Sequence, residues 1–264
     1  MPTEILLELV AEKDVMFPHF TGHISRGLFL HILRQVDPSL SLSLHQPNIR
    51  KPYSVTPLGF KFQKRTTEGK ILEAKNPCQV GFRFLKDELA QKFIKYFYSK
   101  NNVLIFDTEF HVNSITIKTK GYEELEEEAK EPVGKIKLEF RSPTYLTEIG
   151  TDYHLLFPVR TKVFPHLMRL WNEFTSTRKF DEEEQQEYVE WLFKNMGVVA
   201  HKIGTVPAVF KEKTITGFTG WVIYEMKEEN RWNKTTQILA KFAEYSNIGG
   251  NRTGGFGVTR CKIL

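Results

Sequence analysis

The sequence is poor in the residues that build disulfide frameworks and metal centres. Its 264 residues include only two cysteines, Cys78 and Cys261, and neither stands in a CxxC motif or near a histidine at ligand spacing. The histidines include no HExxH pair or comparable arrangement. We therefore predict no disulfide, no metal site and no cofactor, and we interpret both cysteines as core thiols.

Long apolar runs and an export signal are missing as well. No stretch reaches the run of about 18 apolar residues that a membrane span requires. The first residues, MPTEILLELVAEKD, show neither a basic leader region nor a cleavage site. From these absences we expect a cytoplasmic protein without membrane contact. The hydrophobic content of 41% still suffices for one large domain or two of ordinary size.

Negative charge is scarce outside two short segments. Twelve of the 32 acidic residues lie in GYEELEEEAKEPVG (residues 121–134) and DEEEQQEYVE (residues 181–190). Without these segments the chain has 36 basic and 20 acidic residues, an excess of 16, against a net charge of +5 for the whole chain. This excess favours a polyanionic partner, nucleic acid above all. The alternative is ordinary solvated lysine, with the second acidic segment at the start of a helix.

Alternation and helical periodicity divide the chain into two similar halves. Each half has the order β-α-β-β-α-β, which is typical of a ferredoxin-like fold. We therefore predict an α+β protein with antiparallel sheets in two tandem ferredoxin-like domains, residues 1–125 and 134–264. The glutamate-rich segment between them is interpreted as a solvated linker or exposed turn. The predicted strands of the first half are 4–12, 41–46, 53–62, 70–85 and 103–120, and its helices are 24–36 and 86–102. In the second half, strands are predicted at 135–142, 198–210, 214–226 and 256–264, and helices at 161–175, 182–196 and 231–246.

A glycine-rich loop, GGNRTGGFG, connects the last predicted helix to the last strand. It has no Lys-Ser/Thr pair and runs from helix to strand, so it is neither a Walker loop nor a dinucleotide-binding turn. A helix C-cap alone would need one glycine rather than five. We predict that this loop approaches the backbone of an anionic ligand, with Arg252 as a phosphate contact. Its candidate binding residues are Gly249, Gly250, Asn251, Arg252, Thr253, Gly254, Gly255, Phe256 and Gly257.

The candidate catalytic residues lie in a non-periodic segment between two predicted strands. His45 is followed within six residues by Arg50 and Lys51. A histidine titrates near neutral pH, and neighbouring cations can stabilise the extra charge on a phosphorane-like transition state. The alternative is an exposed loop histidine with solvated basic neighbours. His23, His31 and His111 can each be explained as partly buried residues of a helix or strand face.

Several motifs, taken in order, resemble one family across nearly the whole chain. NIGGNRTGGFG (residues 247–257) fits the pattern G-hydrophobic-G, five residues with one basic, then G-hydrophobic-G, except that Asn247 replaces the first glycine. The stretches GLFLHILRQVDPSLSLSLH, KPYSVTPL, RSPTYL and GFTGWVIY also resemble family sequence at matching positions. The chain resembles CRISPR-associated repeat-processing endoribonucleases of the RAMP superfamily, the Cas-six type.

This resemblance implies metal-independent cleavage of the repeat in precursor CRISPR RNA. The upstream 2′-hydroxyl attacks the adjacent phosphate and leaves 2′,3′-cyclic phosphate and 5′-hydroxyl ends. The family histidine, a general acid, corresponds to His45, and the family lysine, which stabilises the transition state, corresponds to Lys51. The tyrosine that serves as base corresponds to Leu30, which cannot accept a proton. Alternative bases are His31, which points about 100° around the helix from Leu30, and His23 and Tyr53.

Two other functions compete with this interpretation. One is a RAMP-type subunit that binds RNA in a CRISPR effector complex without cutting it, a hypothesis that Leu30 supports. The other is an enzyme for a small phosphorylated ligand, which the basic excess disfavours. CRISPR repeat RNA is the expected partner; association with other effector subunits and formation of a homodimer stay open.

Overall fold

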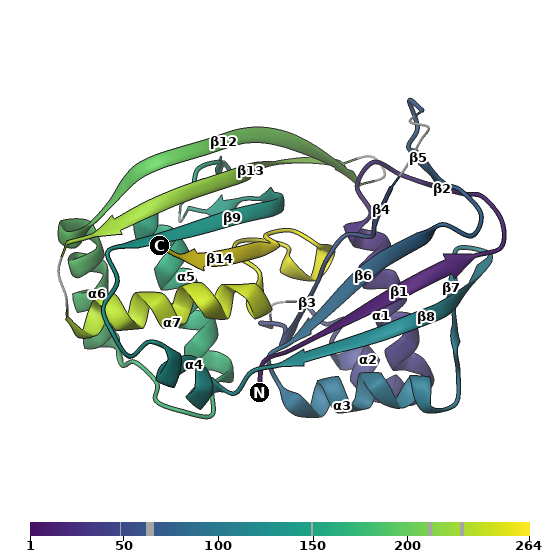
Figure 1. Cartoon of the computed structure of the whole chain (residues 1–264), viewed down its shortest axis with the longest axis horizontal. Helices are drawn as coiled ribbons and strands as arrows, with labels where there is room; N and C mark the ends of the chain where they lie inside the picture. Colours follow the sequence, from purple (N-terminus) through teal and green to yellow (C-terminus); the bar gives the residue numbers. More distant parts are fainter. Residues whose placement is uncertain (48, 62–65, 149, 211–212, 228–229) are drawn as a thin grey trace.

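The computed structural model describes residues 1–47, 49–61, 66–148, 150–210, 213–227 and 230–264. Its two halves lie side by side, each with its own antiparallel sheet and hydrophobic core (Figure 1). No helix among these residues is long and apolar enough to cross a membrane. The prediction of an α+β protein with two ferredoxin-like units is confirmed.

The N-terminal sheet has the strand order β3-β6-β1-β8-β7, with β4 also paired to β6. Its central strand β1 pairs antiparallel with both β6 and β8, as the ferredoxin-like order requires. A separate pair is formed by β2 and β5. The strands are β1 (Thr3–Ala11), β2 (Val15–Phe17), β3 (Tyr53–Val55), β4 (Gly59–Phe60), β5 (Lys70–Leu72), β6 (Pro77–Phe84), β7 (Asn102–Ile105) and β8 (Thr108–Thr119), and the helices are α1 (Gly22–Val36), α2 (Pro38–Ser43), α3 (Asp87–Lys95) and η1 (Tyr96–Tyr98).

The C-terminal sheet repeats this arrangement with the order β12-β13-β9-β14. A long hairpin of β12 and β13 arches toward the N-terminal half (Figure 1). The strands are β9 (Lys135–Thr144), β10 (Leu146–Thr147), β11 (His154–Leu155), β12 (Met196–Phe210), β13 (Lys213–Met226) and β14 (Thr259–Ile263), and the helices are α4 (Tyr122–Glu128), α5 (Arg160–Phe174), α6 (Glu182–Asn195), α7 (Arg231–Ser246) and η2 (Arg252–Gly254).

Several local predictions were wrong. The single strands expected at residues 70–85 and 103–120 are each divided into two strands. The strand expected at residues 41–46 is the end of α2 and the turn after it. Asp37 starts this helix because its carboxylate accepts a hydrogen bond of 2.9 Å from the backbone N–H of Leu40, and Pro38 suits the first turn. The segment expected as a linker contains α4, which buries Tyr122 and Leu125. The boundaries 1–125 and 134–264 stay a prediction.

A small apolar cluster joins the two halves. Phe20 precedes α1, whereas Tyr145, Ala208 and Phe256 belong to the C-terminal half. The Phe20 and Phe256 ring centroids are 5.0 Å apart, and those of Tyr145 and Phe256 are 5.5 Å apart. Because Phe256 lies in the glycine-rich loop, this packing places the loop at the junction of the halves.

Candidate functional site

The glycine-rich loop between α7 and β14 contains backbone conformations that favour glycine. Gly249, Gly255 and Gly257 have φ values of +87°, +83° and +70°. A Cβ atom on Gly257 would also lie 1.8 Å from the carbonyl oxygen of Ile248. These glycines are required by the fold of the loop itself.

The glycine-rich loop packs closely against the start of α1 and against Tyr145. A Cβ atom on Gly255 would lie 2.7 Å from the Cα of Gly22 at the start of α1, and one on Gly22 would lie 2.0 Å from the carbonyl oxygen of Gly254. The Tyr145 ring lies directly against Gly250. We therefore correct the expectation that the whole loop lies against RNA, because most of it is buried between the halves. Only Gly250, Asn251 and Thr253 are partly exposed within residues 249–257.

Arg252 is buried, which does not fit the expected phosphate contact. The residue is only 8% exposed to solvent. Nη1 donates a hydrogen bond of 2.7 Å to the carbonyl oxygen of Ser246, and Nη2 donates one of 3.0 Å to that of Lys51. Burial, with the nearby charge of Arg50, lowers the pKa of Arg252 to about 10. Arg252 thus ties the glycine-rich loop to the segment that carries the candidate catalytic residues.

Asn247, which replaces the first glycine of the family pattern, also joins the two halves. Its φ of 57° and ψ of 167° lie in a backbone region that is nearly restricted to glycine, so Asn247 is held in a strained conformation by its surroundings. Its Oδ1 accepts a hydrogen bond of 2.8 Å from Nη1 of the buried Arg83, and its Nδ2 donates to the carbonyl oxygens of Val55 and Phe256. Arg83 also pairs with Glu4 at 2.8 Å. The asparagine therefore supplies a polar partner to a buried cation, which glycine could not do.

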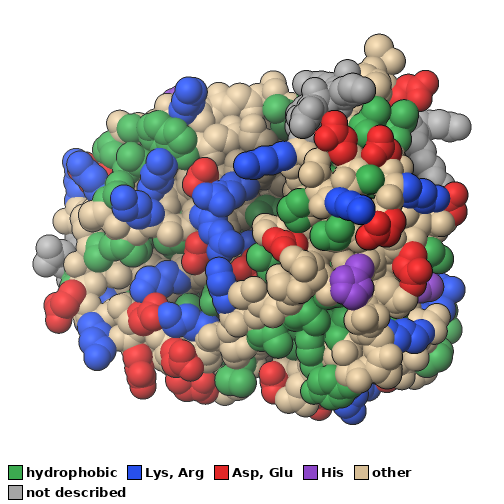
Figure 2. Space-filling view, turned by 45° about the vertical axis from the view of Figure 1, so that its right-hand side comes forward, with side chains coloured by type: hydrophobic (Ala, Val, Ile, Leu, Met, Phe, Trp, Pro, Cys, Tyr) green, Lys and Arg blue, Asp and Glu red, His purple; other side chains and the backbone are tan. Residues whose placement is uncertain are grey.

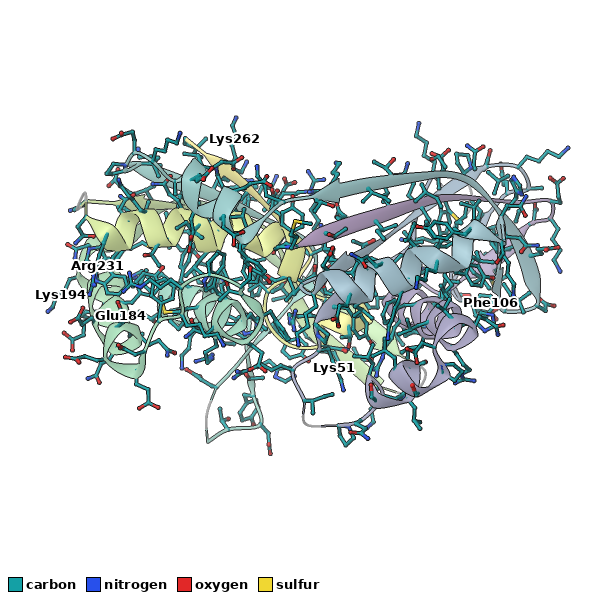
Figure 3. All side chains as sticks on the ribbon, turned by 90° about the horizontal axis from the view of Figure 1, so that it is seen from below. Lys51, Phe106, Glu184, Lys194, Arg231 and Lys262 are labelled. Carbon is teal, nitrogen blue, oxygen red and sulfur yellow. The ribbon has the colours of Figure 1, made fainter. Side chains whose placement is uncertain are left out.

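The segment from α2 to β3 carries the predicted catalytic residues. His45 is exposed, whereas Lys51 is partly buried and donates from Nζ to the carbonyl oxygen of Gln46. Burial, with the charge of Arg26, lowers the pKa of Lys51. Arg50 forms an exposed ion pair of 3.4 Å with Glu173 of α5. The segment is thus held between both halves, with Lys51 at the junction (Figure 3).

Three further residues, which were not selected from the sequence, lie around this segment. Arg26 of α1 lies near Lys51, and Arg169 of α5 lies near Arg50. His166 of α5 accepts a hydrogen bond of 3.2 Å at Nε2 from the backbone N–H of Gly249. Burial and the neighbouring arginines lower the pKa of His166 to about 3, so the ring is neutral. Arg26 could have been found from its spacing, four residues before Leu30 on the same helix face.

The alternative bases are not equally well placed. His31 lines a hollow of about 290 Å³ together with His23, Gly27 and Phe106, on a face of α1 different from that of Arg26 and Leu30. Leu30 itself is 7% exposed. Tyr53 lies close to the charges of Arg26 and Arg252, but burial raises its pKa. A raised pKa keeps the Tyr53 hydroxyl protonated and makes it a poor base.

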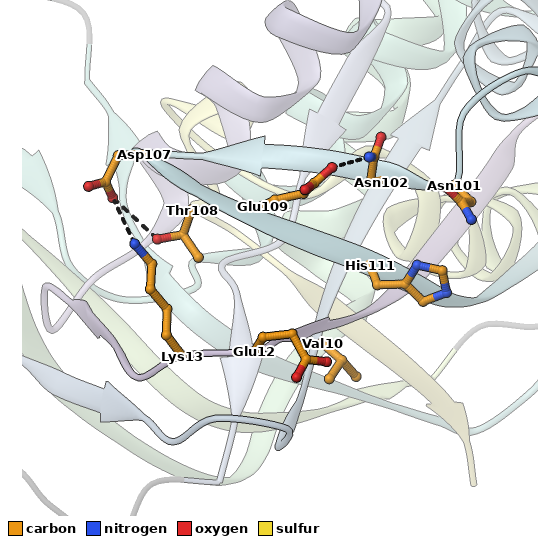
Figure 4. Close-up of a pocket in the computed structure, with 9 residues that line it drawn as sticks. All are labelled: Val10, Glu12, Lys13, Asn101, Asn102, Asp107, Thr108, Glu109 and His111. Carbon is orange, nitrogen blue, oxygen red and sulfur yellow. Dashed lines mark hydrogen bonds and ion pairs between the residues drawn. The ribbon is translucent and has the colours of Figure 1, made fainter.

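A larger hollow lies at the far end of the N-terminal sheet (Figure 4). It has a volume of about 620 Å³, and none of the predicted site residues lines it. Its carboxylates make it a poor site for RNA. No group of three or more potential metal ligands from His, Cys, Asp or Glu was found among the residues that the structure describes. The lining residues are Val10, Glu12, Lys13, Asn101, Asn102, Asp107, Thr108, Glu109 and His111.

The two-unit fold brings the glycine-rich loop and the basic residues Arg26, Arg50 and Lys51 together at the junction of the halves. Lys and Arg side chains also gather in the middle of the face drawn in Figure 2. Residues 1–115 match the model of the CRISPR Cas6 N-terminal domain, and residues 138–259 match that of the CRISPR-associated endoribonuclease Cas6. The chain belongs to the Cas6 family of CRISPR endoribonucleases.

Solved Cas6 structures share the fold of this chain. A Cas6 product complex superposes with a TM-score of 0.82 at 20% identity, covering 99% of this chain and 100% of that one. Cas6 of Thermus thermophilus gives a TM-score of 0.77 at 19% identity, covering 99% and 98%. A Cas6-related protein from Pyrococcus furiosus gives 0.69 at 12% identity and covers 99% of both chains. A comparison with curated proteins returned no match.

Proposed function

We propose that this protein is a metal-independent endoribonuclease that cleaves CRISPR repeat RNA in precursor transcripts. The products are a 2′,3′-cyclic phosphate and a 5′-hydroxyl. Membership of the Cas6 family supports RNA cleavage, and the product complex of a similar Cas6 structure supports binding of RNA by this fold. The chemistry and the catalytic residues are the proposed part.

One observation carries the proposal. The hydrogen bond from Arg252 to the backbone of Lys51 holds the His45–Lys51 segment against the glycine-rich loop. This contact joins residues that are 201 positions apart in the sequence. Arg26 lies near Lys51, and Nζ of Lys51 donates to the carbonyl oxygen of Gln46, the residue that follows the exposed His45. These contacts support a shared role for the three basic residues.

In the proposed reaction, the 2′-oxygen attacks the adjacent phosphorus while the bond from phosphorus to the 5′-oxygen breaks. His45 gives its proton to the departing 5′-oxygen, as a general acid. Lys51 and Arg26 stabilise the additional negative charge on the phosphate oxygens. The proton of the 2′-hydroxyl is lost to solvent water.

The side chain that occupies the family base position takes no part in this scheme. Leu30 has no proton acceptor, and Tyr53 is held in its protonated form by burial. Catalysis then relies on the acid and on the cations, and we expect cleavage slower than with a dedicated base. The expected contribution of His31 as base is not favoured, because it lies on another face of α1.

Leu30 also favours a second candidate function. A protein that retains the RNA-binding surface but has no base could serve as a non-catalytic RNA-binding subunit of a CRISPR effector complex. The accompanying predictions of other effector subunits as partners, of a homodimer and of a cytoplasmic location apply to both functions.

The two functions differ in one experiment. The protein is incubated with end-labelled CRISPR repeat RNA in excess EDTA, next to the same RNA with a single 2′-deoxy substitution before the scissile bond. We expect cleavage of the first RNA to a cyclic-phosphate product, and binding without cleavage of the second. Binding of both RNAs without cleavage, with or without divalent metal, would support the non-catalytic subunit. Cleavage only with a divalent metal would contradict the proposed mechanism.

A further inference from the structure

The short hairpin of β10 and β11 lies next to the exposed part of the glycine-rich loop. Tyr145, just before β10, accepts a hydrogen bond of 3.0 Å at its carbonyl oxygen from the N–H of Gly250. The Tyr145 ring also lies against Gly250. The pairing of Thr147 with His154 closes the hairpin. Its position is therefore fixed relative to the loop that binds the Lys51 segment.

Two aromatic side chains of this hairpin are exposed to solvent. The His154 ring stacks on the Tyr145 ring with centroids 4.1 Å apart and an interplanar angle of 19°. His154 is exposed although Tyr145 beneath it is buried. Tyr153 is 85% exposed.

We propose that Tyr153 and His154 form a stacking platform for an unpaired base of the RNA substrate. This inference rests on the proposed function, because it assigns one nucleotide of the same RNA to the hairpin. The buried Tyr145 ring holds the His154 ring in place before RNA binds, and the exposed Tyr153, next to it in sequence, supplies the second aromatic side chain. Base stacking on such a surface needs no particular base, since every base presents a π-face.

The charges around the hairpin determine which part of the RNA faces it. Cations lie toward the junction, where Arg50, Lys51 and Arg169 can face phosphates. At the hairpin itself, Glu148 pairs with Lys162 at 3.5 Å, and Asp152 adds a negative charge. Because Lys162 offsets the charge of Glu148, the hairpin has little positive charge to attract the phosphate backbone, and stacking is the contact that it offers. It therefore favours an RNA strand whose phosphates follow the junction while one base turns outward to the aromatic rings.

The test combines protein variants with RNA that lacks single bases. Tyr153→Ala and His154→Ala are compared with wild type in binding to labelled CRISPR repeat RNA and to a series with one abasic site each. Tyr98→Ala is the matched control, because Tyr98 is 79% exposed but lies in η1 of the other half. Tyr153→Phe keeps the ring and removes the hydroxyl.

We expect Tyr153→Ala and His154→Ala to weaken binding by roughly 5- to 100-fold, as stacking of one base implies. Tyr98→Ala and Tyr153→Phe should bind like wild type. One abasic site should weaken wild type by a similar factor but barely affect the Tyr153→Ala variant. The platform is overturned if both alanine variants bind as tightly as the Tyr98→Ala control, or if every abasic site weakens wild type and variants equally. Binding is read without cleavage, so a wild type that binds repeat RNA but never cuts it would refute the proposed function alone.

Discussion

The Nη2 atom of Arg252 lies 3.0 Å from the backbone carbonyl oxygen of Lys51. This hydrogen bond connects the last loop of the C-terminal half to the segment just before β3 in the N-terminal half. It gives the arginine of the glycine-rich motif a structural role in positioning the candidate catalytic lysine. The basic residues of the site therefore fall into two kinds. Arg252 is buried and stabilises the site, whereas Arg50 is exposed and can contact RNA.

Arg252→Ala should therefore act on stability before it acts on RNA affinity. The change leaves the buried carbonyl oxygen of Ser246 and the partly buried one of Lys51 without this donor. We expect a loss of roughly 2 to 4 kcal/mol in the free energy of unfolding. Urea titration measures this loss. Cleavage should slow as the Lys51 segment loses its tether, while the salt dependence of log K for RNA stays nearly unchanged.

Arg50→Ala is the matched comparison for this prediction. Arg50 is exposed and paired only across the surface with Glu173, so its removal should cost little stability. It should flatten the salt slope by up to about 0.7 for one single-strand phosphate contact. If Arg252→Ala flattened the slope instead and unfolded like wild type, its guanidinium would reach phosphate in the complex.

His45→Ala should lower the single-turnover cleavage rate by roughly 10² to 10⁴, the usual share of one general acid. RNA affinity should change little, because the residue acts on the leaving oxygen. Lys51→Ala should also act mainly on rate. His31→Ala serves as control and should cut almost as fast as wild type. Abolished cleavage in His31→Ala together with normal cleavage in His45→Ala would place the acid on α1.

Gly255→Ala should destabilise the protein by about 1 to 3 kcal/mol, because it forces a side chain into a left-handed conformation. The new Cβ would also lie 2.7 Å from the Cα of Gly22. Gly27→Ala on α1 is the control, since a Cβ there meets nothing within 4 Å. In a helix this change should stabilise by about 0.4 to 1 kcal/mol. Equal unfolding midpoints for both variants would show that the loop does not depend on its close contact with α1.

Stability should fall as the pH drops below about 6.5, in part because of His166. Its folded-state pKa of about 3 lies below the unfolded value of 6.5, so between these values the unfolded state binds one more proton. Stability therefore rises with pH across this window and levels off above it, by at most about 1.4 kcal/mol per pH unit. Urea midpoints at pH 5, 6, 7 and 8 measure the slope.

His166→Gln isolates this contribution from the other histidines. Its amide oxygen can still accept the hydrogen bond from Gly249, but it does not titrate. We expect a smaller slope between pH 5 and 6.5 than in wild type. Identical slopes would mean that His166 is protonated in the folded protein and that the Gly249 contact has another geometry.

The sequence by itself determined the order of the main elements and the place of the glycine-rich loop, because both depend on local patterns. Periods of 2 and 3.6 residues identify strands and helices, and each half repeats one topology. Local capping chemistry was harder to weigh. The alternating letters of residues 41–46 indicated a strand, whereas Asp37 and Pro38 start a helix just before them.

Only the tertiary structure decided what the loop and its arginine contact. The spacing of glycines shows that something approaches the backbone closely, but not that Gly22 of α1 does so. Burial of Arg252 and the pairing of Arg83 with Asn247 depend on contacts between residues more than 160 positions apart. Such contacts arise when two separately patterned surfaces meet, and no local pattern records which residues then lose water and which stay exposed to bind RNA.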